Sequence, residues 1–314
     1  MKPQTVQNLR NIIFKSLKNN VNTQCAIFDL PYYKNIGDVL IWEGELTFLN
    51  ETGKKIVYAC SSKTCLFPEL DKNVTVLFQG GGNIGDLYIG HTDFLRQIAA
   101  KYSTNQIVVF PQTVYFKDSS IEQAFFKDIE RHPNLTFCCR DWKSHQIAEK
   151  YLKDKALLLP DMAFCINSEF LKVYEQAESS QSLYIKRNDV EKAQLSPHTN
   201  FEKVSDWPPF ERTITSPILV NTLLDRIVPV FKSDSLKRYW DMYALSNFKT
   251  DMIRTGVRFI SPFKTVYSER LHGAILSILL GKNVVVMDNS YGKNSTFYDS
   301  WLTSFSNVKL FNGI

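Results

Sequence analysis

Short apolar runs alternate with helix-like segments along the first half of the chain, and this alternation most constrains its fold. The runs occupy residues 24–30, 55–60, 74–79, 107–110, 135–139 and 156–159, and segments with helical spacing lie at 39–49, 91–102, 120–131 and 142–152. Strands that are apolar on both faces are typical of parallel sheets whose crossover helices cover both sides. We therefore predict an α/β fold.

A polar stretch divides the chain into two parts. Residues 167–182 are rich in Glu, Gln and Ser, and a second series of strand-like and helix-like segments follows, at 183–186, 218–231, 236–255, 265–267, 271–280, 283–287 and 297–305. A chain of 314 residues is long for one core and natural for two. We predict an N-terminal domain over residues 1–175 and a C-terminal domain over residues 176–314, both doubly wound and Rossmann-like, which face each other across a cleft.

Charge and composition narrow the class of protein. The net charge is only +5 and the basic residues are not clustered, so we expect no nucleic-acid partner. The spacing of Cys and His matches no zinc motif, and we expect neither a metal nor a cofactor. The first 20 residues lack the features of a signal peptide and no apolar run is long enough to span a bilayer, which predicts a cytoplasmic protein. A helical face of Val6, Leu9, Ile13 and Leu17 is expected to pack on its own domain, and contact with the inner face of the cytoplasmic membrane is left open.

Two glycine-containing loops follow predicted strands, where open α/β sheets bind their ligands. Residues 35–38 read Asn-Ile-Gly-Asp; Gly37 permits close approach of a ligand and Asp38 is expected to cap the next helix, with a capped turn of no further function as an equal alternative. Residues 79–86 read Gln-Gly-Gly-Gly-Asn-Ile-Gly-Asp. So many glycines favour a loop whose N–H groups hold an anion, although the pattern is neither a Walker A loop nor a dinucleotide-binding fingerprint.

Two further strand ends place basic residues at the same predicted edge. Arg140 follows the run 135–139 and can hold a carboxylate or phosphate with two hydrogen bonds, although a single Arg is more often part of a surface salt bridge. Residues 268–274 join a strand to an apolar helix, so Arg270 and His272 lie at a helix N-terminus. An anion is favoured there, and His can act as acid or base near neutral pH; the alternative is a packed loop capped by serine.

These motifs occur in an order that resembles the polysaccharide pyruvyl transferase family. The matching segments are residues 35–38, 80–86, 140–141, 161–164 and 268–272, with residues 187–191 and 206–207 as further landmarks of the exopolysaccharide branch. The resemblance extends from about Phe28 to Trp301. It implies a fold similar to that of GT-B glycosyltransferases and transfer of pyruvate from phosphoenolpyruvate to a sugar as a ketal, with release of phosphate, in capsule or exopolysaccharide biosynthesis.

The resemblance also implies roles for individual residues. Donor binding, mainly by the C-terminal domain, is expected of Arg140, Arg270, Leu271, His272 and Lys293. The acceptor side or its loops are expected to include Gly37, Gly80, Gly81, Gly82 and Asn83. We predict that His272 is the general acid that protonates the methylene carbon of the donor, and that either Asp38 or Asp86 removes the proton of the attacking hydroxyl.

Two other functions stay open at this point. One is a GT-B glycosyltransferase that uses a nucleotide sugar, and the other is a non-catalytic protein that binds a sugar or an anion. The expected acceptor is galactose or glucose in a polysaccharide repeat or a lipid-linked oligosaccharide. Residues 197–251 contain few landmarks, so the acceptor, the ketal positions and stereochemistry, and the oligomeric state are left undetermined.

Overall fold

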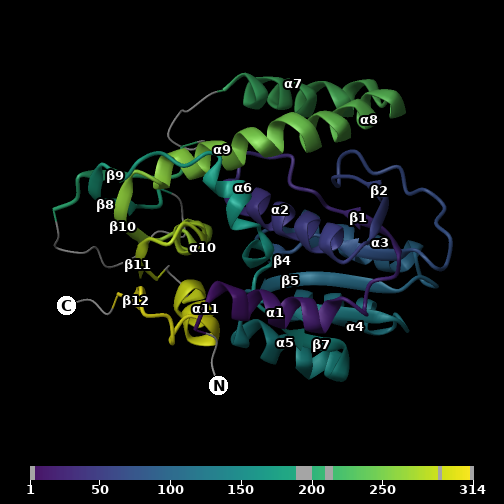
Figure 1. Ribbon diagram of the computed structural model, residues 1–314. Helices are drawn as coiled ribbons and strands as arrows, with labels where there is room; N and C mark the ends of the chain where they lie inside the picture. The colour runs from purple at the N-terminus through teal and green to yellow at the C-terminus, as the bar shows by residue number, and fades with distance from the viewer. Residues whose placement is uncertain (1–3, 189–199, 209–214, 289–291, 312–314) are drawn as a thin grey trace.

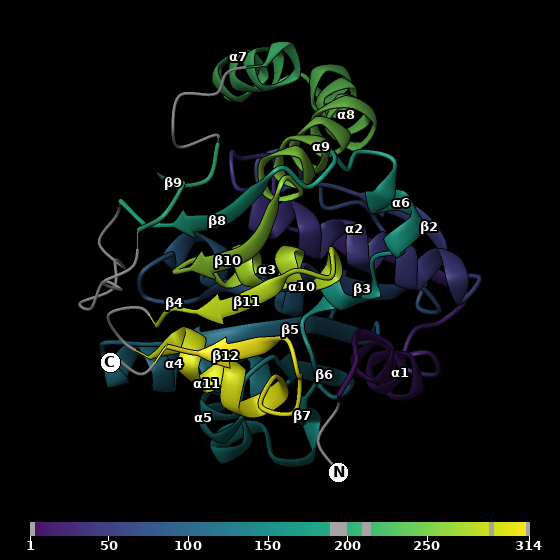
Figure 2. The ribbon, with the colours of Figure 1, turned by 60° about the vertical axis from the view of Figure 1, so that its left-hand side comes forward.

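The strands form two parallel sheets in the part of the chain that the structure describes. The structure is a computed structural model that describes residues 4–188, 200–208, 215–288 and 292–311. Within these ranges, a seven-stranded first sheet has the order β2-β1-β3-β5-β6-β7, with β4 paired to β5, and a five-stranded second sheet has the order β12-β11-β10-β8-β9. All pairings between these strands are parallel. The predicted α/β class with parallel sheets is confirmed (Figures 1 and 2).

Helices cover both faces of the first sheet. Its strands are β1 (Gln24–Phe28), β2 (Lys55–Ala59), β3 (Thr75–Phe78), β4 (Gly81–Gly85), β5 (Ile107–Tyr115), β6 (Leu135–Cys139) and β7 (Ala156–Leu158). Its helices are α1 (Val6–Leu17), α2 (Ile36–Glu51), α3 (Ile89–Lys101), α4 (Ser119–Glu130) and α5 (Trp142–Leu152), followed by 3₁₀ turns at Lys153–Lys155 and Met162–Cys165 and by α6 (Ser168–Lys172). Alternate residues of β1 enter different cores: Ala26 packs with α3, α4 and α5, and Ile27 packs with α1 and α2. This alternation explains the continuous apolar runs in the sequence.

The second sheet follows along the chain. Its strands are β8 (Ser180–Ile185), β9 (Lys203–Ser205), β10 (Phe263–Ser268), β11 (Asn283–Val286) and β12 (Val308–Leu310). Its helices are α7 (Ser216–Phe231), α8 (Asp234–Tyr243), α9 (Lys249–Ile260), α10 (Leu271–Leu279) and α11 (Lys293–Trp301), with a π-helical turn at Ala244–Phe248 between α8 and α9. Figure 2 shows β8, β10, β11 and β12 side by side.

Helix α2 lies between the two sheets, and most of its residues are buried. Ile36 and Val39 belong to the core of the second sheet, together with Val266 of β10. Trp42 and Phe48 belong to a core of the first sheet. The predicted boundary between residues 175 and 176 falls between β7 and β8, but because α2 contributes to both cores, the division into two domains stays a prediction.

Four predicted segments differ from the structure. The glycine segment is the strand β4, because β5 continues to Tyr115 and offers it a pairing edge. Asn35, and not Asp38, caps α2: its side-chain oxygen accepts a hydrogen bond from the Gly37 N–H at 3.0 Å. The predicted helix over residues 236–255 is interrupted by the π-helical turn. The final helix begins at Lys293 instead of residue 297, and the chain then forms β12.

Buried polar contacts attach the hairpin of α7 and α8 to the loop that follows β1. Asn221 Nδ2 donates to the Tyr32 carbonyl at 2.7 Å, and Trp240 Nε1 donates to Asn221 Oδ1 at 2.8 Å. Asp241 Oδ1 accepts from the hydroxyls of Tyr32 at 2.9 Å and Thr64 at 2.6 Å. Burial raises the pKa of Asp241 to about 6. The loop held in this way leads directly into the start of α2.

Candidate functional site

A polar cavity of about 230 Å³ lies where the carboxyl ends of strands from both sheets meet. Apart from Gly82 and Asn83, which belong to β4, the lining residues follow the ends of strands, which is where open α/β sheets bind ligands. The side chains are almost all polar, and four of them are Arg or Lys. The lining residues are Asn35, Asp38, Gly82, Asn83, Tyr88, Arg140, Arg187, Trp207, Arg270, Leu271, His272, Lys293 and Asn294.

Arg140, Asp161 and His272 form a buried charged group at one wall of this cavity. Arg140 is 1% exposed; its Nε donates to Thr113 Oγ1 at 2.8 Å and its Nη1 donates to Asp161 Oδ2 at 2.8 Å. Nε2 of His272 lies 3.2 Å from the same carboxylate oxygen and 3.4 Å from Arg140 Nη1. Burial alone would raise the pKa of Asp161, but His272 and Arg140 hold it well below its usual range. The ionised carboxylate therefore orients both side chains and favours a proton on Nε2 of His272.

Two glycines leave the space in which these side chains lie. A Cβ at residue 82 would lie 2.4 Å from Lys293 Nζ and 2.8 Å from Arg140 Nη2. A Cβ at residue 37 would lie 2.5 Å from Nδ1 of His272. Such separations are below van der Waals contact, so Gly82 allows two cations to converge and Gly37 leaves room beside the imidazole.

The remaining cations come from loops after strands of the second sheet. Arg270 precedes α10 and donates to Asp206 through Nε at 2.8 Å and Nη2 at 2.6 Å, and this two-point pairing fixes the guanidinium against the cavity. Arg187 follows β8, and Lys293 is the first residue of α11. The N-termini of α10 and α11 both lie at the cavity, where the dipoles of the two helices add to the positive potential.

The structure separates the two aspartates considered for the role of base. Asp38 lines the cavity, and its Oδ2 accepts a hydrogen bond from Asn35 Nδ2 at 2.7 Å. Asp86 is not among the lining residues. Its Oδ2 accepts from the backbone N–H groups of Lys117 at 2.7 Å and Asp118 at 2.8 Å, so it holds the turn before α4. The geometry favours Asp38 for the chemistry.

The glycine strand has a different role from the anion-binding loop expected of it. The N–H of Gly80 points inward and donates to Oε1 of the buried Glu45 at 2.8 Å, away from the cavity. Burial raises the pKa of Glu45 well above its usual range. Gly81 pairs with Gln112 of β5. The chief role of the segment is therefore steric: without side chains, its glycines let Lys293 and Arg140 lie close to its backbone. Gly82 and Asn83 line the cavity directly.

Several site residues were not assigned roles by the sequence. Asp161 was noted only as part of a segment that matches the family. The sequence signal that could have identified it is its position just after a predicted strand. Tyr88 gave no signal, because its place at the cavity depends on how β4 leads into α3. Arg187, Trp207 and Asn294 also line the cavity. Residues 189–191 of one predicted landmark and Tyr291, two positions before Lys293, lie outside the described residues.

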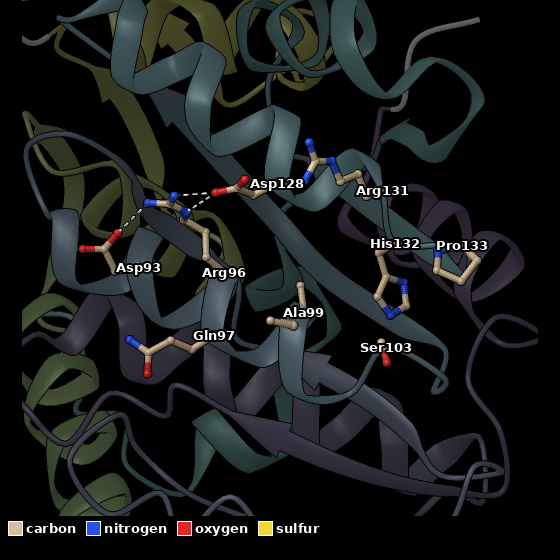
Figure 3. Close-up of a pocket in the computed structure, with 10 residues that line it drawn as sticks. Asp93, Arg96, Gln97, Ala99, Ser103, Asp128, Arg131, His132 and Pro133 are labelled. Carbon is tan, nitrogen blue, oxygen red and sulfur yellow. Dashed lines mark hydrogen bonds and ion pairs between the residues drawn. The ribbon is translucent and has the colours of Figure 1, made fainter.

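Other hollows are less suited to chemistry. The hollow of about 620 Å³ in Figure 3 lies between α3 and α4 near the loops that precede β5 and β6, at the opposite edge of the sheet. Its Arg96 is paired with Asp93 at 3.2 Å and with Asp128. A separate cavity of about 110 Å³ is lined by Tyr33 and by the buried Asp29, whose Oδ2 lies 2.6 Å from Nδ1 of His91.

Fold and site together define an α/β protein with a small, strongly cationic cavity that contains a histidine and a carboxylate, as expected of an enzyme that acts on an anionic substrate. The model of the family described as polysaccharide pyruvyl transferase matches residues 35–291. The chain belongs to the polysaccharide pyruvyl transferase family, whose reaction is pyruvyl transfer in polysaccharide biosynthesis. This confirms the resemblance found in the sequence.

Individual relatives agree with this family. EpsO of Bacillus subtilis, which carries the name of a pyruvyl transferase, is 32% identical over 288 residues, covering 90% of this chain and 86% of EpsO. Pyruvyl transferase 1 of Schizosaccharomyces pombe is 24% identical over 298 residues, covering 88% of this chain and 69% of that protein. A crystal structure of a functionally uncharacterised protein from Klebsiella pneumoniae has a TM-score of 0.65 at 20% identity, covering 97% of this chain and 99% of that one. That structure supports the fold alone.

Two features are absent from the residues that the structure describes. No helix in these ranges has both the length and the apolar character needed to cross a bilayer. No cluster of three or more His, Cys, Asp or Glu side chains in these ranges has the arrangement of a metal site.

Proposed function

We propose that this protein transfers the pyruvyl group of phosphoenolpyruvate to two hydroxyls of one sugar, forming a cyclic ketal and releasing phosphate. One observation supports this most strongly: Arg140, Arg187, Arg270 and Lys293 converge with His272 on one cavity of about 230 Å³. Phosphoenolpyruvate has a phosphate and a carboxylate on a three-carbon unit, so its site needs several cations in a small space.

Family membership separates this proposal from its nearest rival. The chain belongs to a family described as polysaccharide pyruvyl transferase, and its relatives EpsO and pyruvyl transferase 1 carry the name of pyruvyl transferases. The cluster of cations around a histidine also exceeds what a neutral sugar requires, which disfavours a simple sugar-binding protein. These arguments favour the transferase over both alternatives.

The first step is protonation of the donor. His272 in its imidazolium form gives a proton to the methylene carbon, which becomes a methyl group and leaves a cationic centre at C2. Because Nε2 faces Asp161, we assign this transfer to Nδ1, beside Gly37. A positioned general acid contributes roughly 10²–10⁴-fold to the rate. Arg140 is fixed by Thr113 and Asp161 in the same group and is our candidate contact for a donor oxygen.

The second step builds the ketal. A sugar hydroxyl attacks C2 and gives its proton to Asp38, which lines the cavity beside Asn35. The bond between C2 and the phosphate oxygen then breaks, and a second hydroxyl of the same sugar attacks C2 and closes the ring. Asp38 passes the proton of the first hydroxyl to the departing phosphate, and the proton of the second hydroxyl restores His272. The acceptor is proposed to be galactose or glucose in a polysaccharide repeat or lipid-linked oligosaccharide, met in the cytoplasm or at the inner face of its membrane.

The donor is tested by thermal-shift titration with phosphoenolpyruvate, with UDP-galactose and inorganic phosphate in parallel. A ligand that binds only the folded state adds about 2.7 kcal/mol at a hundred times its dissociation constant. We expect phosphoenolpyruvate to raise the melting temperature of the protein. This rise should be lost in Lys293→Ala and in Arg270→Ala, each compared with its own melting temperature without ligand. Arg96→Ala, which removes a paired arginine of the hollow in Figure 3, is the matched control. A shift with UDP-galactose alone would support the glycosyltransferase instead.

A further inference from the structure

Charge divides the cavity into two unlike walls. Three of its four cations, Arg187, Arg270 and Lys293, come from the part of the chain that builds the second sheet. The part that builds the first sheet contributes amides, a carboxylate and a phenol at Asn35, Asp38, Asn83 and Tyr88, together with the buried guanidinium of Arg140. A carboxylate repels an anionic donor. The wall that the first sheet contributes, with Asp38 and its neighbouring amides, therefore suits a neutral ligand with many hydroxyls.

Tyr88 belongs to a short exposed apolar segment at the mouth of the cavity. Leu87 and Tyr88 lie between β4 and α3, Ile89 is the first residue of α3, and the three are 52%, 48% and 43% exposed. Consecutive large apolar side chains in contact with water often mark a binding surface. Tyr88 lines the cavity itself, and with Leu87 it also lines the narrow hollow that continues from it past Gly82 and Asn83. Its ring therefore borders the ligand space.

Polar atoms lie close together on the same wall. Oδ1 of Asp38 and Nδ2 of Asn83 lie 3.6 Å and 3.7 Å from the position that a Cβ at Gly81 would occupy. Asn83 Nδ2 also donates to the hydroxyl of Tyr33 at 3.0 Å, and Asn35 Nδ2 donates to Asp38. Amide, carboxyl and phenol groups are therefore arranged beside one exposed aromatic ring.

We infer that Tyr88 is the platform on which the acceptor sugar stacks, with Asn83 and Asp38 hydrogen-bonded to its hydroxyls. A pyranose has an apolar face of C–H groups and a rim of hydroxyls; an aromatic ring matches the face, and amide and carboxyl groups match the rim. In this arrangement the reacting hydroxyls point toward Asp38 and toward the cationic wall where the donor lies. Tyr88 is thus a specificity-determining residue for a hexopyranose acceptor. This inference rests on the proposed function, since it places the acceptor next to the phosphoenolpyruvate site.

The test measures phosphate release with phosphoenolpyruvate and methyl β-D-galactopyranoside, with the glucopyranoside in parallel. Tyr88→Ala is expected to raise the KM for the sugar by about tenfold or more while the KM for phosphoenolpyruvate changes by less than about twofold. Tyr88→Phe and Tyr88→Trp keep an aromatic ring and should retain acceptor binding. Tyr239→Ala is the control, since Tyr239 is 49% exposed on α8 and does not line the cavity.

An unchanged KM for the sugar in Tyr88→Ala, or an equal rise for donor and acceptor, would overturn the inference. If the unmodified protein releases no phosphate from phosphoenolpyruvate, the proposed function fails, and binding of the same glycosides is then followed by saturation-transfer NMR without donor. Binding that is lost in Tyr88→Ala and kept in Tyr88→Phe supports the platform independently of the donor. Absence of any glycoside binding contradicts it.

Discussion

Asp161 and Asp241 are two aspartates that lie largely out of water, and the protein treats their charges in opposite ways. Asp161 lies against Arg140 and His272, and these two neighbours hold its pKa well below the usual range despite burial. Asp241, on the hairpin helix α8, accepts hydrogen bonds from the hydroxyls of Tyr32 and Thr64, and burial raises its pKa to about 6. The neighbours of Asp161 in the site therefore stabilise its negative charge. Asp241 has only neutral hydroxyls as hydrogen-bond partners, and its negative charge stays unfavourable in the folded protein.

The sharpest test of this comparison is Asp161→Asn. The amide can no longer balance the buried guanidinium of Arg140 or fix the imidazole of His272. We expect a loss of about 3–5 kcal/mol in unfolding free energy, because one member of a buried ion pair is removed. Phosphate release should fall by about a hundredfold or more. Urea unfolding and steady-state kinetics measure the two effects.

Asp161→Glu keeps the charge and guards against the possibility that Asp161→Asn does not fold. It should recover much of the lost stability but little of the turnover, since its longer side chain moves the carboxylate away from its two partners. Near-normal turnover in Asp161→Asn would show that its negative charge does not serve the chemistry.

Gly82→Ala tests whether the convergence of two cations matters at the site. The added Cβ would lie 2.4 Å from Lys293 Nζ and 2.8 Å from Arg140 Nη2. Lys293 Nζ is the end of a flexible side chain, but the Arg140 guanidinium is held by Thr113 and Asp161, so stability should fall by about 1–3 kcal/mol. The KM for phosphoenolpyruvate should rise by about tenfold. Gly90→Ala is the matched control, because a Cβ there meets nothing within 4 Å; equal effects of the two substitutions would argue against a role for Gly82.

Asp241→Asn removes the costly charge of the hairpin while keeping an oxygen for Tyr32 and Thr64. Because the pKa of Asp241 is raised from 3.8 to about 6, the charged form is disfavoured in the folded state at neutral pH. We expect the variant to gain on the order of 1–2 kcal/mol in unfolding free energy near pH 7, allowing for partial solvent screening. Thermal or urea unfolding measures this, and a loss of stability would mean that the charge is favourable after all.

The smallest effect is the pH dependence of stability that the two aspartates impose. Asp241 binds its proton more tightly when folded, so its contribution to stability is greatest below its ordinary pKa of 3.8 and is lost as the pH rises to about 6. Asp161 has a lowered pKa, so its contribution is present above 3.8 and is lost only at more acidic pH. Urea unfolding should show that the free energy of unfolding declines as the pH rises from about 4 to about 6, and that this decline is absent in Asp241→Asn. If the variant shows the same decline, other groups cause it.

The repeated strands and helices of the first half were predictable because their signal is local. Residues 25–28 and 107–110 are apolar on both faces, and a parallel sheet covered by helices on both sides buries both faces. The glycine segment was misjudged as a loop because its pairing depends on how far β5 continues beyond its neighbours. The interruption of the helices at residues 244–248 and the early start of α11 also depend on tertiary packing.

The sequence by itself determined the α/β class, the family and most of the cationic residues, because apolar periodicity and motif order are properties of neighbouring positions. Only the tertiary structure decided how these residues combine. It placed Asp161 between Arg140 and His272, moved Asp86 to the turn before α4, and brought Tyr88 to the cavity. These relations join residues as far as 111 positions apart, and such contacts depend on strand order, on register and on the packing of α2 between the sheets.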